Sequence, residues 1–512
     1  MFVFVFGAVV MKMYLTKNLL TILQDYFMEF IDLLVIAGYF IVLVCIGIYA
    51  GRKVKNSEDF MVAGRTLGFP VLLGTLVGSA IGAAATFGKA GKAYEVGYAI
   101  LIASVAYILG YVVLCFLAPK LQQAKIDTIP GALERRYGKS MRIIAAIVLV
   151  LGVIALFGAQ LIAIGLTAEV VFADFGLTFE HAVVIASLVI VIYTLVGGLL
   201  AVAYNDLFQT IIMLIGGGLL LPVFLTLDLG PQVTDALVSP ATEFLGGMHW
   251  GYVLSFFPIY FAFVLIDPSI WQRIAASKNT SDLKPAFIAT AAIFMFWSLI
   301  VVTLGVIAFN ILPDLAHRDS VIPTLVMNHM PPLVKGVCLA AIMGIIISTA
   351  DSALLVTGTT VSTDLFKVLK PEISDKQQLR ITRITVFIVG ICGLIFALQK
   401  SNIFEVMMLS LATFVAGLFV PVMAALFYKK ATSVAALASA IIGALVLLTA
   451  FAAKSHGLLP DGVEPILLAL VCSSLAMWLT SSITFNQETA TQPLLRKLKH
   501  QAPIRSPLPV ES

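Results

Sequence analysis

The chain has 512 residues, of which 60% are hydrophobic and only 12% are charged, and its mean hydropathy is +1.04. An ordinary soluble domain is about 45–50% apolar and about 25% charged, so a soluble fold is excluded. The net charge of +4 is spread between apolar segments and forms no basic face, so it gives no indication of a nucleic-acid partner. At roughly 20 residues per span, the length accommodates about a dozen membrane helices with short loops, and no sizeable aqueous domain.

Apolar stretches predict about 13 membrane spans in one continuous all-α domain over residues 28–485. In chain order they lie near 31–50, 69–88, 96–118, 141–168, 181–203, 207–228, 251–271, 287–311, 332–355, 381–398, 404–428, 432–453 and 464–485. Residues 1–27 hold a short apolar run followed by Lys12. They are either an extension upstream of a natural start at Met28 or an extra segment at the membrane surface.

Loops rich in Lys and Arg alternate with loops that lack them, as the positive-inside rule requires of a multi-span protein. The rich stretches are 51–68, 119–142, 273–286, 366–383, 429–431 and the tail 486–512, whereas the loop 229–250 has neither residue. We therefore expect an integral protein of the plasma membrane, the inner membrane in a bacterium, with the N-terminus outside and the C-terminal tail in the cytoplasm.

The cysteines indicate neither a disulfide framework nor a metal site. They are odd in number, lie inside apolar segments and follow no CxxC spacing. The five positions are Cys45, Cys115, Cys338, Cys392 and Cys472.

The second predicted span places glycines among small residues. Gly74, Gly78 and Gly82 recur at intervals of four in VLLGTLVGSAIGAAATFGKAG. Two structures fit this pattern: a close helix-packing face, or a helix that unwinds within the membrane and frees carbonyl groups to bind a cation.

The ninth predicted span carries a cluster of polar side chains. Ser348, Thr349, Asp351 and Ser352 lie within five positions. A single hydroxyl in a membrane helix usually bonds to a carbonyl of the preceding turn, but several oxygen-bearing side chains together are typical of a site for a dehydrated cation. Alternatively, Asp351 lies near the cytoplasmic end of the span and is solvated.

A glycine pair and a carboxylate separate the fifth and sixth predicted spans. Gly197 and Gly198 end one helix, and Asp206 follows where the next begins. We expect Asp206 to cap that helix, a role that is compatible with binding a cation.

Five segments, taken in order, resemble the sodium:solute symporter family over about residues 28–485. They are GIYAGRKVKNSEDFMVAGRTLG (47–68), TFGKAGKAYEVGYA (86–99), GGLLAVAYNDLFQ (197–209, with Asn205 where the family usually has threonine), PSIWQRIAASKNTSDLKPA (268–286) and ISTADSALLVTGTTVSTDLF (347–366). The resemblance implies the inverted five-plus-five repeat of sodium-coupled amino-acid transporters, with one extra N-terminal span and two C-terminal spans. The second and seventh spans are then the paired broken helices.

The resemblance also implies where sodium, the only metal ion expected, would bind. The principal site would take the carbonyls of Gly78, Ile81 and Ile345 and the hydroxyls of Ser348 and Thr349. A second site, present in some members, would combine Asp206 with Ser348, Asp351 and Ser352.

For the solute, the resemblance implies a small pocket with few hydrogen-bonding groups. The implied pocket residues are Ala80, Ala85, Gln160, Tyr260, Phe263 and Ser410, with Thr167 and Thr413 in the same spans. Sugar-carrying members place polar side chains on the broken helix where this chain has alanines, so a sugar would leave its hydrogen bonds unmade. We expect a small carboxylate or amino acid, with its carboxylate held by N–H groups of the broken helix.

Together these features predict a symporter rather than an enzyme, which moves a small organic solute inward with sodium by alternating access. Its expected partners are the solute, sodium and the bilayer, with no nucleic acid and no obligatory protein partner. One alternative is a proton-coupled carrier on the same fold, with Asp206 or Asp351 as the proton acceptor. The other is a transporter-like membrane sensor, although only about 27 residues follow the last span. No ring-forming filter motif of a channel is present.

Overall fold

The computed structural model of the chain describes residues 30–172, 176–226, 246–315, 317–399 and 402–485. In these ranges all regular structure is helical, and β pairing is limited to an isolated bridge between Leu67 and Ser277. The expected all-α class is therefore confirmed. The expectations for residues 1–27, for the tail 486–512 and for most of the loop 229–250 fall outside the described residues.

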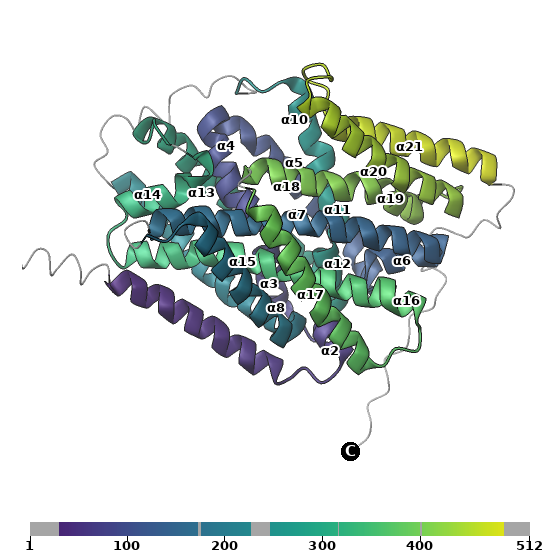
Figure 1. Cartoon of the computed structure of the whole chain (residues 1–512), viewed down its shortest axis with the longest axis horizontal. Coiled ribbons are helices and arrows are strands. Elements are labelled where there is room, and N and C mark those ends of the chain that lie inside the picture. Colours follow the sequence, from purple (N-terminus) through teal and green to yellow (C-terminus); the bar gives the residue numbers. More distant parts are fainter. Residues whose placement is uncertain (1–29, 173–175, 227–245, 316, 400–401, 486–512) are drawn as a thin grey trace, which may run out of the picture.

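The helices follow one another with short connections (Figure 1). After a first helix at Phe30–Gly51, they are α2 (Ser57–Val62), η1 (Ala63–Arg65), α3 (Phe69–Ala80), η2 (Ala84–Gly88), α4 (Lys89–Val96), η3 (Gly97–Ile100), α5 (Leu101–Gln123), α6 (Ile129–Tyr137), α7 (Lys139–Val171), α8 (Phe179–Thr226), α10 (Trp250–Phe256), η5 (Phe257–Phe261), α11 (Ala262–Ile266), α12 (Pro268–Ala276), α13 (Thr280–Ile311), η6 (Arg318–Ser320), α14 (Val321–His329), α15 (Val334–Thr360), η7 (Val361–Phe366), α16 (Lys367–Leu369), α17 (Asp375–Ala397), α18 (Ile403–Phe414), η8 (Val415–Phe419), α19 (Val420–Phe427), α20 (Ser433–Ser455) and α21 (Pro465–Thr484).

Within the described residues, 11 helices are long and apolar enough to cross a membrane. Two further apolar helices, Phe69–Ala80 and Phe179–Ile192, are shorter and fall on the predicted second and fifth spans. The positions of the predicted spans agree with these helices, but the count of 13 is not confirmed. The short second helix reflects an interruption that the hydropathy of the sequence does not show.

Two helices are interrupted in mid-course, in the second and seventh predicted spans. α3 ends at Ala80 because Ile81 adopts an extended conformation (φ −104°, ψ 90°), and the chain returns to helix through the π-helical turn η2 and α4. Further on, Asp267 (φ −68°, ψ 115°) separates α11 from α12. Its Oδ1 accepts hydrogen bonds from the N–H groups of Ser269 (2.7 Å) and Ile270 (3.4 Å), and Pro268 suits the first position of α12.

The two broken helices are joined to each other by main-chain hydrogen bonds near the start of α3 and the end of α12. The N–H of Leu67, just before α3, donates to the carbonyl of Ala276 at the end of α12 (3.1 Å). The N–H of Lys278 donates in turn to the carbonyl of Leu67 (2.8 Å). The segments that flank the two interrupted helices are therefore joined by main-chain hydrogen bonds.

The helix α8 bends sharply at the expected glycine pair. Gly198 has φ +57° and ψ −164°, a conformation that only glycine adopts readily, and a Cβ there would lie 2.7 Å from the carbonyl oxygen of Phe60. The helix then continues past Asp206 without a second start. The expectation that Asp206 caps a helix is therefore wrong, because the break comes at Gly198 and leaves Asp206 within a helix.

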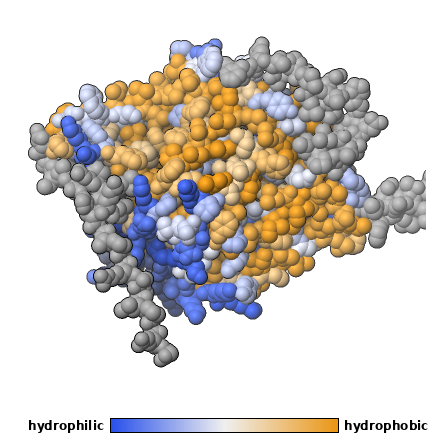
Figure 2. Space-filling model, turned by 180° about the vertical axis from the view of Figure 1, so that it is seen from behind, coloured by the Kyte–Doolittle hydropathy of each residue, from blue (hydrophilic) through white to orange (hydrophobic). Residues whose placement is uncertain are grey.

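The helix α15 lies at the centre of the bundle. Every residue from 338 to 360 is buried, and α15 packs against α3, α7 and α8. At the periphery, the helix Phe30–Gly51 and the pair α20 and α21 lie at opposite edges (Figure 1). Apolar residues cover much of the face in Figure 2, and hydrophilic ones gather at one side. Polar side chains on α15 therefore face other helices, as an intramembrane functional site requires.

Candidate sodium and solute site

The hydroxyls of α15 face the point where α3 stops. Ser348 Oγ lies 2.9 Å from the carbonyl oxygen of Gly78, and Thr349 Oγ1 lies 3.3 Å from the same oxygen. The two hydroxyls also lie 3.1 and 3.5 Å from the carbonyl oxygen of Ile345. Four of the five groups predicted for the principal sodium site thus converge from two helices that are distant in sequence.

The fifth predicted residue, Ile81, is the interruption itself. Its extended backbone ends the helical hydrogen-bond pattern and frees carbonyl groups at this turn. At the next residue, Gly82, a Cβ would come within 2.6 Å of Thr349 Oγ1. Glycine is needed here because α15 approaches the interruption so closely.

Neutral oxygens make up this cluster, and they suit a hard monovalent cation. Carbonyl and hydroxyl oxygens replace the hydration shell of such an ion without adding a negative charge that must itself be buried. Elsewhere in the described residues, no group of three or more His, Cys, Asp and Glu side chains comes together to hold a different metal. The donor set fits sodium, and its role as ligand remains a prediction.

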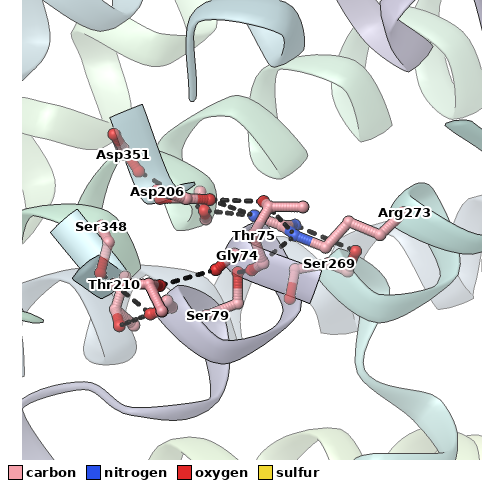
Figure 3. A network of polar contacts seen from close by, with 12 residues as sticks. Gly74, Thr75, Ser79, Asp206, Thr210, Ser269, Arg273, Ser348 and Asp351 are labelled. Carbon is pink, nitrogen blue, oxygen red and sulfur yellow. Dashed lines mark hydrogen bonds and ion pairs between the residues drawn. The ribbon is translucent and has the colours of Figure 1, made fainter. Parts of the chain in front are cut away.

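Asp206 is paired with an arginine that the sequence analysis did not single out. Arg273 Nη2 lies 3.2 Å from Asp206 Oδ2, and both side chains are fully buried. Thr75 Oγ1 donates to the same carboxylate oxygen at 2.5 Å, and Arg273 Nε donates to Thr75 Oγ1 at 2.8 Å. Figure 3 shows this network with Ser348 and Asp351 nearby. Because a Cβ at Gly78 would lie 3.2 Å from that of Asp206, the ion pair packs directly behind the oxygen cluster.

The predicted second sodium site lies within the same network. Arg273 Nη2 donates to Ser352 Oγ at 2.7 Å, and Ser352 Oγ lies 3.4 Å from Asp351 Oδ1. Asp206 Oδ1 has no hydrogen-bond partner among the described residues. Asp351 is fully buried in α15, so the alternative in which it is solvated is wrong. The second site stays a prediction, and Arg273 places a positive charge beside it.

A cavity lies beside both helix interruptions. Residues from α3 and its break, from the α11–α12 junction and from α15 line it, among them Ser79, Gly82, Asp267, Ser269, Thr349 and Ser352. Thr349 therefore belongs to the wall of the cavity as well as to the oxygen cluster, and Gly82 in the same wall lies against it. A solute in this cavity would therefore contact Thr349, one of the predicted ion ligands.

Four of the predicted pocket residues line this cavity: Ala80, Ala85, Tyr260 and Phe263. The hydroxyls of Thr167 and Thr413 instead donate to carbonyls of their own helices at 2.7 and 2.8 Å. The predicted residues that line the cavity are thus apolar or aromatic.

Gln160 and Ser410 are not among the residues that line the cavity. Ser410 Oγ donates to the carbonyl of Gly152 at 2.8 Å. Gln160 Oε1 accepts a hydrogen bond from the N–H of Ala83 at 2.9 Å. Gln160 therefore stabilises the interrupted helix by satisfying one of the N–H groups that were expected to hold the solute carboxylate.

Two charged side chains that the sequence analysis did not assign to the pocket also line the cavity. Lys89 is the first residue of α4 and Asp267 lies between α11 and α12, and each is only 5% exposed. The signal for Lys89 was available, because a lysine next to an apolar span is costly unless it serves a function. Asp267 gave a similar signal, because it is a carboxylate within the predicted span 251–271, but its position at a helix break depends on the tertiary structure.

Comparison with known proteins identifies the family of the chain. The sequence pattern of the sodium:solute symporter family matches residues 60–443. The chain is 28% identical to the osmoregulated proline transporter OpuE of Bacillus subtilis, over 89% of this chain and 95% of that protein. It is 26% identical to the sodium/proline symporter of Staphylococcus aureus, over 81% of this chain and 85% of that protein.

Among solved structures, the chain resembles a Na⁺-coupled sialic acid symporter in a substrate-bound outward-open state, with a TM-score of 0.77 and 20% identity. The match covers 90% of this chain and 98% of that one, so the fold is that of the inverted-repeat sodium-coupled transporters. The family and these relatives are transporters and not enzymes. The chain is an integral membrane protein that belongs to the sodium:solute symporter family, the class that moves small organic solutes by sodium-coupled symport.

Proposed function

We propose that the chain carries a small amino or imino acid into the cell together with sodium. The observation that carries this proposal is the double position of Thr349, whose hydroxyl lies 3.3 Å from the Gly78 carbonyl and whose side chain lines the cavity. An ion at this point would hold α3 against α15 and fix one wall of the pocket. Sodium then raises the affinity for solute, and solute raises the affinity for sodium by the same factor.

The proposed solute class rests on the pocket and on the relatives. Ala80, Ala85 and Phe263 line the cavity and offer no side-chain hydrogen bonds to the hydroxyls of a sugar. The relatives described above are named as proline transporters. A compact solute with a carboxylate fits both observations.

The direction of transport follows from the coupled ion. Each sodium that moves inward contributes about 2.3 kcal/mol per 100 mV of membrane potential, in addition to its concentration gradient. Release of sodium to the inside would free α3 from α15 and weaken the hold on the solute. We propose Gly78, Ile81, Ile345, Ser348 and Thr349 as the ligands of this ion.

The proposal is tested with purified full-length protein in proteoliposomes, with the twenty common amino acids as radiolabelled probes. An inward sodium gradient should drive accumulation of at least one of them above the outside concentration. An equal gradient of choline, with or without an added proton gradient, should not. Accumulation driven by protons without sodium would establish the proton-coupled alternative, and no accumulation of any amino acid would refute the solute class.

We also propose that the N-terminus is outside and the C-terminus is in the cytoplasm. Lys278, between α12 and α13, and Lys376, in the first turn of α17, are exposed in Lys- and Arg-rich stretches. Leu458, 75% exposed, lies between α20 and α21. In a background without the five native cysteines, Lys278→Cys and Lys376→Cys should react with a membrane-impermeant thiol reagent only after permeabilisation, and Leu458→Cys should react in intact cells. The reverse pattern would invert the proposed topology.

A further inference from the structure

Lys89 places a buried ammonium group beside the cavity. Its Nζ donates to Ser104 Oγ and to Ser298 Oγ, each at 2.8 Å, and lies 4.5 Å from the ring centre of Phe294. These partners are neutral, and Lys89 forms no ion pair with any described residue. An ammonium group carries three N–H donors, so one remains for a further acceptor.

The same cavity also contains a negatively charged side chain, that of Asp267. Of the described residues that line it, Lys89 is the one cation and Asp267 the one anion. All hydrogen bonds to Asp267 from the described residues, those of the Ser269 and Ile270 N–H groups and the Ser269 hydroxyl, go to Oδ1. Oδ2 therefore remains as an acceptor. Two opposite charges on the wall of one cavity match the two ends of a zwitterion.

The interrupted helix itself is less suited to hold a carboxylate. The N–H of Ala83, which follows the break, donates to Gln160 Oε1 at 2.9 Å. A buried ammonium without an anionic partner is costly in a membrane protein, and a solute carboxylate would offset that cost. Lys89 is thus the stronger anchor for a carboxylate in this cavity.

We propose that Lys89 binds the carboxylate of the transported solute and that Asp267 accepts a hydrogen bond from its amino or imino group. The inference rests on the proposed function, because it assigns residues to the solute of that same site. It makes the charge on each end of the solute the main determinant of selectivity.

The first test is the KM for uptake of L-proline, or of whichever common amino acid the wild type carries best, into proteoliposomes under an inward sodium gradient. Lys89→Met should raise this KM about tenfold or more, the loss expected for one hydrogen bond to a charged group. Lys89→Arg keeps the positive charge and should lose less. Lys92→Gln serves as the matched control, because Lys92 lies on the same helix and pairs with Glu95 (2.7 Å).

Folding is checked separately by the stabilisation that sodium alone gives to the purified protein against heat. Lys89→Met should keep this sodium effect, because the oxygen cluster is built from other residues. Asp267→Asn should keep it too, since asparagine caps a helix nearly as well as aspartate. A raised KM with an intact sodium effect then reports on solute binding.

The second test identifies which end of the solute each residue binds. For proline, pyrrolidine lacks the carboxylate and cyclopentanecarboxylate lacks the imino group, and both should compete poorly in the wild type. In Lys89→Met, which cannot bind a carboxylate, pyrrolidine should compete about as well as proline. In Asp267→Asn, which binds the imino group less well, cyclopentanecarboxylate should compete about as well as proline.

If Lys89→Met has an unchanged KM and still discriminates against pyrrolidine as the wild type does, the assignment of Lys89 is wrong. The proposed function would still hold in that case, provided that the wild type takes up the amino acid. If Asp267→Asn still discriminates against cyclopentanecarboxylate as the wild type does, the assignment of Asp267 is wrong. A wild type that carries no amino acid would refute the proposed function, and the inference with it.

Discussion

Replacing Ser348 or Thr349 by alanine is expected to raise the sodium concentration for half-maximal transport about tenfold or more in each case. Each change removes one of the hydroxyls that face the Gly78 carbonyl at 2.9 and 3.3 Å. A hydrogen-bonding or ligand group that faces a charge contributes about 1.5–3 kcal/mol, which corresponds to about tenfold or more in affinity. The measurement is the sodium dependence of initial uptake rates in proteoliposomes.

Ser439→Ala is the matched control for these variants. Its hydroxyl is buried and hydrogen-bonded to Ser473 at 2.8 Å, between α20 and α21, so its loss removes a similar contact away from the oxygen cluster. Sodium dependence should be normal in this variant. If Ser348→Ala and Thr349→Ala behave like the control at normal protein levels, the sodium site is wrongly placed.

Replacing Arg273 by methionine is expected to destabilise the protein by about 3–5 kcal/mol, because it leaves the carboxylate of Asp206 buried without its cation. The double variant Arg273→Met/Asp206→Asn should recover much of this loss, since no uncompensated charge then remains. The measurement is a double-mutant cycle of unfolding free energies, or of thermal midpoints, for the purified protein.

Arg318→Met provides the comparison for an ion pair at the surface. Arg318 pairs with Glu95, and its side chain is 53% exposed, so its removal should cost about 1 kcal/mol or less. A double variant at Arg273 and Asp206 that is no more stable than Arg273→Met alone would show that the two side chains are not energetically coupled.

Much of the architecture could be predicted because the bilayer imposes a strong pattern on the sequence. Spans are long and apolar, and the glycines from Gly74 to Gly82 mark a helix that both packs closely and unwinds. A Cβ at Gly74 would lie 2.6 Å from the Cα of Leu207, so Gly74 lies on a close helix-packing face. The helix unwinds at its other end, next to Gly82. The meeting of Ser348 with Gly78 was predicted only through the family resemblance.

The charged parts of the site were harder to predict, because their partners lie far apart in the sequence. Arg273 begins a loop that counts as cytoplasmic by its charge, yet α12 carries it into the bundle, where it meets Asp206. Asp206 does not cap a helix because α8 resumes directly after Gly198 and not at Asp206. Neither the pairing nor the burial of these residues is encoded in local sequence patterns.

The main-chain junction at Leu67 has a mechanical consequence. It joins the start of α3 to the end of α12 through two backbone hydrogen bonds of 3.1 and 2.8 Å, and Arg65 and Gln272 add bonds of 3.1 and 2.6 Å to the carbonyls of Ala275 and Met61. Because bonds of this kind contribute about 0.5–1.5 kcal/mol each, separating the two segments costs several times the thermal energy. We therefore expect the start of α3 and the end of α12 to move together, so that an ion bound at the break of α3 would also change the position of α12.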